Sequence, residues 1–179
     1  MVLVGRRMRR LYAGERLGTS ASYACMIDGI WSGGTWVRWG VDNREAPVWL
    51  TKVHKLSSRN FEIRPIDGTS NPYLAVAGVL PCGIIGVRDN LELMVKNCDV
   101  GHSAAQMSVE EREAAFGITK TLPLDIGEAR RCLAADDAIK DLVGVELVES
   151  FINVNEVKRR VHFDRTVADS DLTSRCLQR

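Results

Sequence analysis

The pattern of hydrophobic and polar positions changes near residue 71. Before it, short runs rich in aromatic and β-branched residues are separated by glycine and polar turns, which is typical of strands. Their close spacing predicts neighbouring antiparallel strands rather than parallel strands joined by helices. The expected strands are residues 35–39, 47–51 and 60–64, with turns at 32–34, 42–43 and 57–58.

After residue 71 the apolar positions follow helical spacing. Asn71 followed by Pro72 predicts a helix start, because the asparagine can cap free N–H groups and proline at the first helical position loses no needed donor. Pro81 lies inside this run, and we expect it to kink or shorten the helix, with Gly86 near the end. The apolar stripe consists of Tyr73, Val76, Ala77, Leu80 and Ile84.

Two later segments begin with capping signatures. Ser108 is followed three residues later by Glu111, and Asp125 by Glu128, so each predicts a helix N-terminus. Gly144 separates a short helix from a longer one, in which we expect a buried stripe. The residues of that expected stripe are Leu147, Phe151 and Val154.

These elements predict an α+β fold in which antiparallel strands are followed by covering helices. We expect a basic, poorly ordered segment at residues 1–20, one domain at 21–163 and a polar, disordered tail at 164–179. The first segment contains Arg6, Arg7, Arg9 and Arg10, with no acid before residue 15. This resembles a mitochondrial transit peptide, although a frayed basic terminus or an arbitrary start is the favoured interpretation.

Composition narrows the function classes. The chain has 179 residues, 45% hydrophobic and 26% charged, with a net charge of +1, so nothing favours nucleic acid as a partner. No apolar run is long enough to span a bilayer, so we expect no membrane partner. The five cysteines are widely spaced and odd in number, which argues against a disulfide framework or zinc site. A reduced, cytoplasmic protein is expected.

The strongest candidate chemistry lies at Glu62 and Arg64. Residues two apart on a strand point to the same face, so a carboxylate and a guanidinium should stand side by side ahead of the helix start at Asn71. Such a pair could hold a metal–phosphate complex, with the glutamate on the cation and the arginine on phosphate oxygens. Taken alone, a surface ion pair is the favoured alternative.

A second candidate is Arg44, which projects from a turn within Asn43-Arg44-Glu45. The alternative there is a solvated hairpin loop, which is favoured on chemistry alone. A cluster of tryptophans could stack on a base, although core packing is the usual role of tryptophans in strands. The cluster comprises Trp31, Trp36, Trp39 and Trp49.

Three sequence motifs, taken in their order along the chain, change this interpretation. Residues 22–31 read Ser-Tyr-x-x-x-x-x-Gly-x-Trp, residues 39–47 read Trp-Gly-Val-Asp-Asn-Arg-Glu-Ala-Pro, and residues 61–74 read Phe-Glu-Ile-Arg-Pro-Ile-Asp-Gly-Thr-Ser-Asn-Pro-Tyr-Leu. Together they resemble the C-terminal part of the glutamine synthetase catalytic domain. The resemblance covers roughly residues 20–160 and is closest to the fungal branch, in which a glutamine-synthetase-like domain can follow an amidohydrolase-like one.

The resemblance implies part of a catalytic half-barrel and a glutamate–ammonia ligase of glutamine biosynthesis. Such an enzyme joins ammonia to glutamate through a γ-glutamyl phosphate, with ATP as co-substrate and Mg²⁺ or Mn²⁺ as cofactor. It also implies a homo-oligomer. By the same resemblance, Glu62 binds metal, Arg64 contacts the substrate glutamate, and Arg44 lies near phosphate and substrate.

The chain also departs from the family pattern. Cys25 and Trp49 stand where the family usually has arginines, and the preceding parts of the family's catalytic domain have no counterpart before residue 22. A non-catalytic module acting through protein contacts is therefore the alternative function. If the missing part packs against the strands, we expect an apolar surface near Trp31, Trp36 and Trp39 to be bare.

Overall fold

A computed structural model describes residues 23–30, 33–66, 68, 70–99, 101 and 103–157. The predictions for residues 1–20, for Trp31 and for the tail 164–179 lie outside these residues. Among the described residues, no helix is both long and apolar enough to cross a membrane.

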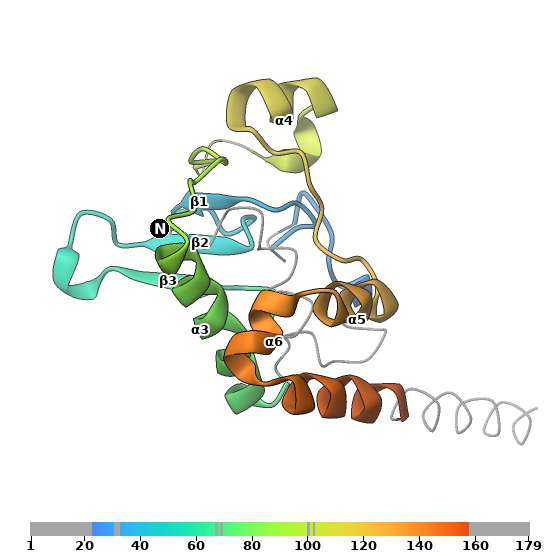
Figure 1. Ribbon diagram of the computed structural model, residues 1–179. Helices are drawn as coiled ribbons and strands as arrows, with labels where there is room; N and C mark the ends of the chain where they lie inside the picture. Colours follow the sequence, from blue (N-terminus) through green and yellow to red (C-terminus); the bar gives the residue numbers. More distant parts are fainter. Residues whose placement is uncertain are drawn as a thin grey trace, which may run out of the picture.

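A small mixed sheet of three strands lies at the centre, in the order β1-β2-β3 (Figure 1). The strands are β1 (Trp39–Val41), β2 (Val48–Thr51) and β3 (Asn60–Ile63). β2 and β3 are antiparallel, as predicted, with Trp49 opposite Glu62. Strands and helices together confirm the α+β class.

The prediction of antiparallel pairing is wrong for β1 and β2, which are parallel with Trp39 opposite Val48. This register requires the connection 42–47 to bring the chain back to the end where β1 begins. The returning segment is held there because Arg38, just before β1, donates from Nη2 to the carbonyl oxygen of Glu45 at 2.9 Å. A short connection can therefore join two parallel strands when other residues form hydrogen bonds with its backbone polar groups.

The expected strand at 35–39 is also displaced. β1 begins at Trp39, and the residues before it pair with a distant segment instead, through an isolated antiparallel bridge between Trp36 and Thr121. The Val37 N–H donates to the Lys120 carbonyl oxygen at 2.9 Å on the same path. This pairing links the N-terminal half of the fold to the segment that leads into α5 (Ile126–Ala134).

The helix α3 (Pro72–Arg88) begins as predicted. The Asn71 side chain accepts from the backbone N–H groups of Tyr73 at 2.9 Å and Leu74 at 3.4 Å. Pro81 does not shorten the helix, which continues beyond Gly86. Cys82 and Ile85 lie beyond the proline and are buried in the core, so packing stabilises the second half despite the lost backbone donor.

The remaining helices follow their predicted starts. Ser108 forms the expected capping box with Glu111, and the Asp125 side chain accepts from the Glu128 N–H at 2.8 Å. The helix α6 (Asp137–Val143) ends at Gly144, and residues 145–157 form a further helix. The remaining elements are the helix α4 (Val109–Phe116) and the 3-10 turns η1 (Leu56–Ser58) and η2 (Ala104–Gln106).

The predicted buried stripe of the helix at 145–157 is confirmed only in part. Phe151 is partly buried against the core, whereas Leu147 and Val154 are exposed, and Val148, which was not predicted, is buried. Leu147, Val148 and Phe151 line one apolar cavity together with Leu133 of α5 and Ile139 of the next helix. The buried face of this helix therefore includes Val148 and Phe151 and leaves out Val154.

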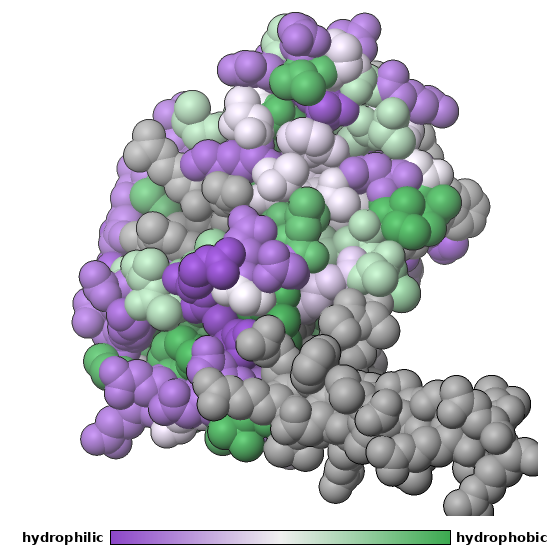
Figure 2. All heavy atoms as spheres, turned by 90° about the vertical axis from the view of Figure 1, so that its right-hand side faces the viewer, coloured by the Kyte–Doolittle hydropathy of each residue, from purple (hydrophilic) through white to green (hydrophobic). Residues whose placement is uncertain are grey.

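The hydrophobic core lies between one face of the sheet and the helices α3, α5 and α6, while α4 stands apart (Figure 1). Trp39 is buried in this core, and Trp36 packs against it. The predicted bare surface near these two tryptophans is therefore wrong. The face seen in Figure 2, on the side of α5, mixes hydrophilic side chains with small separate groups of apolar ones.

Candidate functional site

The face of the sheet opposite the core carries the predicted site. Along β2, Val48 and Leu50 are buried while Trp49 between them is half-buried. Successive strand residues point to opposite faces, so Trp49 lies on the outer face. Glu62 is its cross-strand partner on β3, and cross-strand partners lie on the same face.

Glu62 and Arg64 form an ion pair. Arg64 Nη1 donates to Glu62 Oε1 at 2.5 Å, with about a fifth of the arginine side chain exposed. The backbone fixes the position of the arginine, because its N–H donates to the Pro47 carbonyl oxygen at 3.0 Å. Gly33 packs tightly here, since a Cβ at this glycine would lie 3.3 Å from the Arg64 Cβ.

Trp49 connects the third predicted residue to this pair. The Arg44 guanidinium carbon lies 5.1 Å from the centroid of the Trp49 ring, a cation–π geometry. The structure thus brings Glu62 and Arg64 into direct contact and places Arg44 on the ring that stands opposite Glu62. Cys25, by contrast, is an exposed free thiol.

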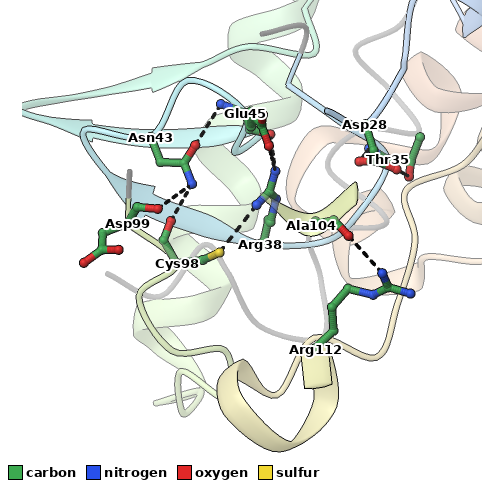
Figure 3. Close-up of polar contacts among 9 residues, drawn as sticks. All are labelled: Asp28, Thr35, Arg38, Asn43, Glu45, Cys98, Asp99, Ala104 and Arg112. Carbon is green, nitrogen blue, oxygen red and sulfur yellow. Dashed lines mark hydrogen bonds and ion pairs between the residues drawn. The ribbon is translucent and has the colours of Figure 1, made fainter. Parts of the chain in front are cut away.

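Asn43 anchors the connection that carries Arg44 (Figure 3). Its side chain is buried and its Nδ2 donates to the carbonyl oxygens of Cys98 at 2.8 Å and Asp99 at 2.9 Å. Its Oδ1 accepts from the Glu45 N–H at 2.9 Å. The residue before Arg44 therefore fixes the loop against a segment 55 positions away.

Arg38 also contacts the connection that carries Arg44, through Glu45 (Figure 3). Its fully buried guanidinium contacts Glu45 through the carbonyl oxygen and through Oε2 at 3.5 Å, and reaches Cys98 Sγ at 3.4 Å. Burial raises the pKa of the Cys98 thiol, and the nearby Arg38 charge partly opposes this. The thiol therefore stays neutral beside the arginine.

Sequence reasoning missed Asn43 and Arg38 as anchors. Their partners in the segment at Cys98 lie 55 to 60 positions away, and the contact of Arg38 with Glu45 depends on the path of the connection, so no local pattern identifies either anchor. The adjacency of Asn43 to Arg44 was the only local signal available for either residue.

The described residues do not fit a complete metal site. Nowhere in the described ranges do three or more His, Cys, Asp or Glu side chains come together as a metal centre requires. Glu62 offers one carboxylate that Arg64 already neutralises in part. A divalent cation would need further ligands from outside this part of the chain.

Comparison with known proteins assigns the family. The model of the glutamine synthetase catalytic domain matches residues 17–173. This chain belongs to the glutamine synthetase family. The Glu62–Arg64 pair and the loop that carries Arg44 both lie within the matched residues.

Two curated relatives illustrate how much of such a protein the chain represents. Protein fluG of Emericella nidulans is 40% identical over 144 residues, which cover 80% of this chain and 16% of that protein. The glutamine synthetase of Staphylococcus epidermidis is 30% identical over 137 residues, 76% of this chain and 29% of the enzyme. The chain therefore spans less than a third of the length of either relative.

Solved structures show the same fold. The structure of a GmaS/ADP complex matches with a TM-score of 0.55 at 18% identity. The match covers 87% of this chain and 36% of that one, so the described fold corresponds to one part of a larger chain.

Proposed function

We propose that this chain supplies part of the active site of a glutamate–ammonia ligase, which forms glutamine from glutamate, ammonia and ATP through a γ-glutamyl phosphate. The observation that carries the proposal is the Glu62–Arg64 pair, set on the outer face of β3 ahead of the α3 cap in a chain of this family. The pair joins a carboxylate to a guanidinium fork suited to carboxylate or phosphate oxygens.

Arg64 would bind the carboxylate of the substrate glutamate. The substrate then replaces Glu62 as the partner of the guanidinium, because one fork cannot make two parallel bonds to both carboxylates. Arg64 is held by backbone contacts at Pro47, so it needs little reorganisation to receive the substrate.

Arg44 would contribute positive charge near the transferred phosphoryl group. Charge on the phosphoryl oxygens grows during transfer, and a preorganised guanidinium stabilises it. Stacking on Trp49 restricts the arginine, which Asn43 and Arg38 hold further through the loop. Trp49 itself offers no positive charge where the family usually has an arginine.

ATP and Mg²⁺ or Mn²⁺ belong to the proposal at the level of the family. Glu62 would be one ligand of such a cation, and the others would come from outside the described residues. We place the assembly in the cytoplasm as a homo-oligomer, by analogy with the family.

The second candidate is a non-catalytic glutamine-synthetase-like module that acts through protein contacts. It is favoured by Trp49 and Cys25 at positions where the family usually has arginines. It predicts that a folded chimera containing this chain does not carry out γ-glutamyl transfer.

The experiment is a chimera in which this chain replaces the matched region of the Staphylococcus epidermidis glutamine synthetase. We expect metal-dependent γ-glutamyl transfer to hydroxylamine, lowered about 100-fold or more by Arg64→Gln, since one lost transition-state donor has effects of this size. Arg59→Gln, an exposed arginine on the same hairpin, serves as the matched control and should retain activity. A folded but inactive chimera would favour the non-catalytic module.

A further inference from the structure

Two consecutive glycines beside the candidate site have backbone conformations that other residues rarely adopt. Gly33 and Gly34, called here the glycine pair, have φ angles of +91° and +65°. Both angles lie in the region that a side chain makes unfavourable. The chain therefore follows a path here that the glycines permit, and this path brings it against both parts of the candidate site.

Gly33 lies against the strand end that leads to Arg64. A Cβ at Gly33 would be 3.3 Å from the Arg64 Cβ and 3.8 Å from the Pro47 Cα. Pro47 is also the residue whose carbonyl oxygen accepts from the Arg64 N–H, at 3.0 Å. Gly33 thus packs where Arg64 and Pro47 are joined, and in a closely packed structure its position limits where the arginine can lie.

Gly34 lies against the connection that carries Arg44. A Cβ at Gly34 would be 3.2 Å from the Glu45 carbonyl oxygen and 3.7 Å from Arg38 Nη2. These two atoms form the 2.9 Å hydrogen bond that fixes the connection. The glycine pair therefore contacts the surroundings of both candidate arginines.

The side chain of Asp28 binds the residue directly after the glycine pair (Figure 3). Its Oδ1 accepts from the Thr35 N–H at 2.8 Å, and its Oδ2 accepts from the Thr35 hydroxyl. Oδ1 would lie 2.6 Å from a Cβ at Gly34, so the carboxylate also packs over this glycine. The Thr35 carbonyl oxygen accepts from the Leu122 N–H at 2.7 Å. Thr35 is thus fixed through its N–H, its hydroxyl and its carbonyl group.

We propose that Asp28 is a positioning residue for Arg64. Its bonds to Thr35 hold the glycine pair against Arg64 and Glu45, and this contact preorganises the guanidinium that would bind the substrate glutamate. Asp28 acts through Gly33 and does not itself touch substrate. Its role in substrate binding rests on the proposed function, whereas its effect on Arg64 does not.

A residue that only closes its own turn would behave differently. Its loss would lower the free energy of unfolding, and amides that exchange through global unfolding would then lose protection equally. Loss of a positioning residue increases local opening, so the amide at Arg64 should lose more protection than amides elsewhere. Hydrogen exchange therefore separates the two roles without any measurement of activity.

The first test is amide hydrogen exchange of the 179-residue chain, followed by NMR. The reference is the Lys96 N–H, which donates to the Phe116 carbonyl oxygen at 2.9 Å. We expect Asp28→Ala to lower the protection of the Arg64 N–H at least about tenfold more than that of the Lys96 N–H, because two hydrogen bonds to Thr35 are lost.

Two further variants control this result. Asp28→Asn should restore the protection of Arg64, because the amide can accept from the Thr35 N–H and donate to the Thr35 hydroxyl. Asp125→Ala is the matched control, since Asp125 likewise accepts from a backbone N–H at 2.8 Å but caps α5. It should leave the ratio of the two protections unchanged.

Near-ultraviolet circular dichroism checks that each variant is folded. If Asp28→Ala does not fold, Thr35→Val replaces it, because valine keeps the N–H and removes only the hydroxyl bond. We then expect a loss of protection at Arg64 of about fivefold relative to Lys96, as for one hydrogen bond.

The second test uses the chimera with the Staphylococcus epidermidis enzyme. ATP-dependent hydroxamate formation from glutamate and hydroxylamine gives separate KM values for glutamate and for ATP. We expect Asp28→Ala to raise the KM for glutamate about tenfold or more, because a displaced Arg64 binds the carboxylate less well. The KM for ATP should not change, and Asp28→Asn should restore the KM for glutamate.

The outcomes separate this proposal from the proposed function. Selective loss of protection at Arg64 that Asp28→Asn restores supports the proposal. If the chimera then makes no hydroxamate, the proposed function fails while the positioning of Arg64 stands. Equal loss of protection at Arg64 and Lys96 overturns the proposal, because Asp28 is then only structural. An active chimera in which Asp28→Ala leaves the KM for glutamate unchanged also overturns it.

Discussion

Replacing Asn43 should destabilise the loop that carries Arg44 without changing any proposed ligand-binding group. Asn43→Ala deletes two donated hydrogen bonds, to the carbonyl oxygens of Cys98 and Asp99, and one accepted from the Glu45 N–H. Alanine also leaves the buried Cys98 carbonyl without this donor. At about 1 kcal/mol net for each bond, the free energy of unfolding should fall by about 2–3 kcal/mol.

The matched control for Asn43→Ala is Asn97→Ala. Asn97 makes one exposed bond, in which its Oδ1 accepts from the Val41 N–H at 2.9 Å. Its loss should therefore change the free energy of unfolding by about 0.5–1 kcal/mol. Urea unfolding followed by circular dichroism measures both values. If Asn43→Ala lowers the free energy of unfolding no more than Asn97→Ala, then Asn43 does not anchor the Arg44 loop as argued.

Two further predictions concern the segment beneath this loop. Burial raises the pKa of the Cys98 thiol, so the unfolded chain loses this proton first, near its ordinary pKa of about 8.5. The free energy of unfolding should then fall as pH rises from there toward the folded-state pKa. The slope of this free energy against pH, measured by urea unfolding, should be smaller in Cys98→Ala, and equal slopes would count against the prediction. Gly40→Ala should prevent native folding, because its Cβ would lie 2.1 Å from the Cys98 carbonyl oxygen. A native circular dichroism spectrum and melting curve for Gly40→Ala would contradict this close approach.

The sequence predicted what local interactions determine. Helix starts at Asn71, Ser108 and Asp125 were predictable because each cap is a side chain bonding to backbone two or three residues away. The antiparallel pairing of β2 and β3, which are consecutive along the chain, was also predicted.

Non-local contacts determined the rest of the fold. The parallel pairing of β1 and β2 depends on a returning loop that Arg38 and Asn43 fix, in part through Cys98. The buried face of α3 could not be predicted either, because a helix that is apolar all round has no polar face to mark the outside.

Only part of the candidate site could be predicted from the sequence. The two-residue spacing of Glu62 and Arg64 predicted their shared face, and the contact between them agrees with it. The stacking of Arg44 on Trp49 was not predicted, because it depends on the loop path. The family resemblance named these residues, and their functional roles stay proposals.

The measurement that tests the central claim most directly is metal-dependent γ-glutamyl transfer to hydroxylamine, made on the chimera, on its Glu62→Gln variant and on the chain alone. The account assigns this chain a necessary but incomplete part of the site. It therefore predicts transfer by the chimera, loss of transfer in Glu62→Gln and none by the chain alone. Equal transfer by the chimera and its Glu62→Gln variant, or transfer by the chain alone, would contradict it.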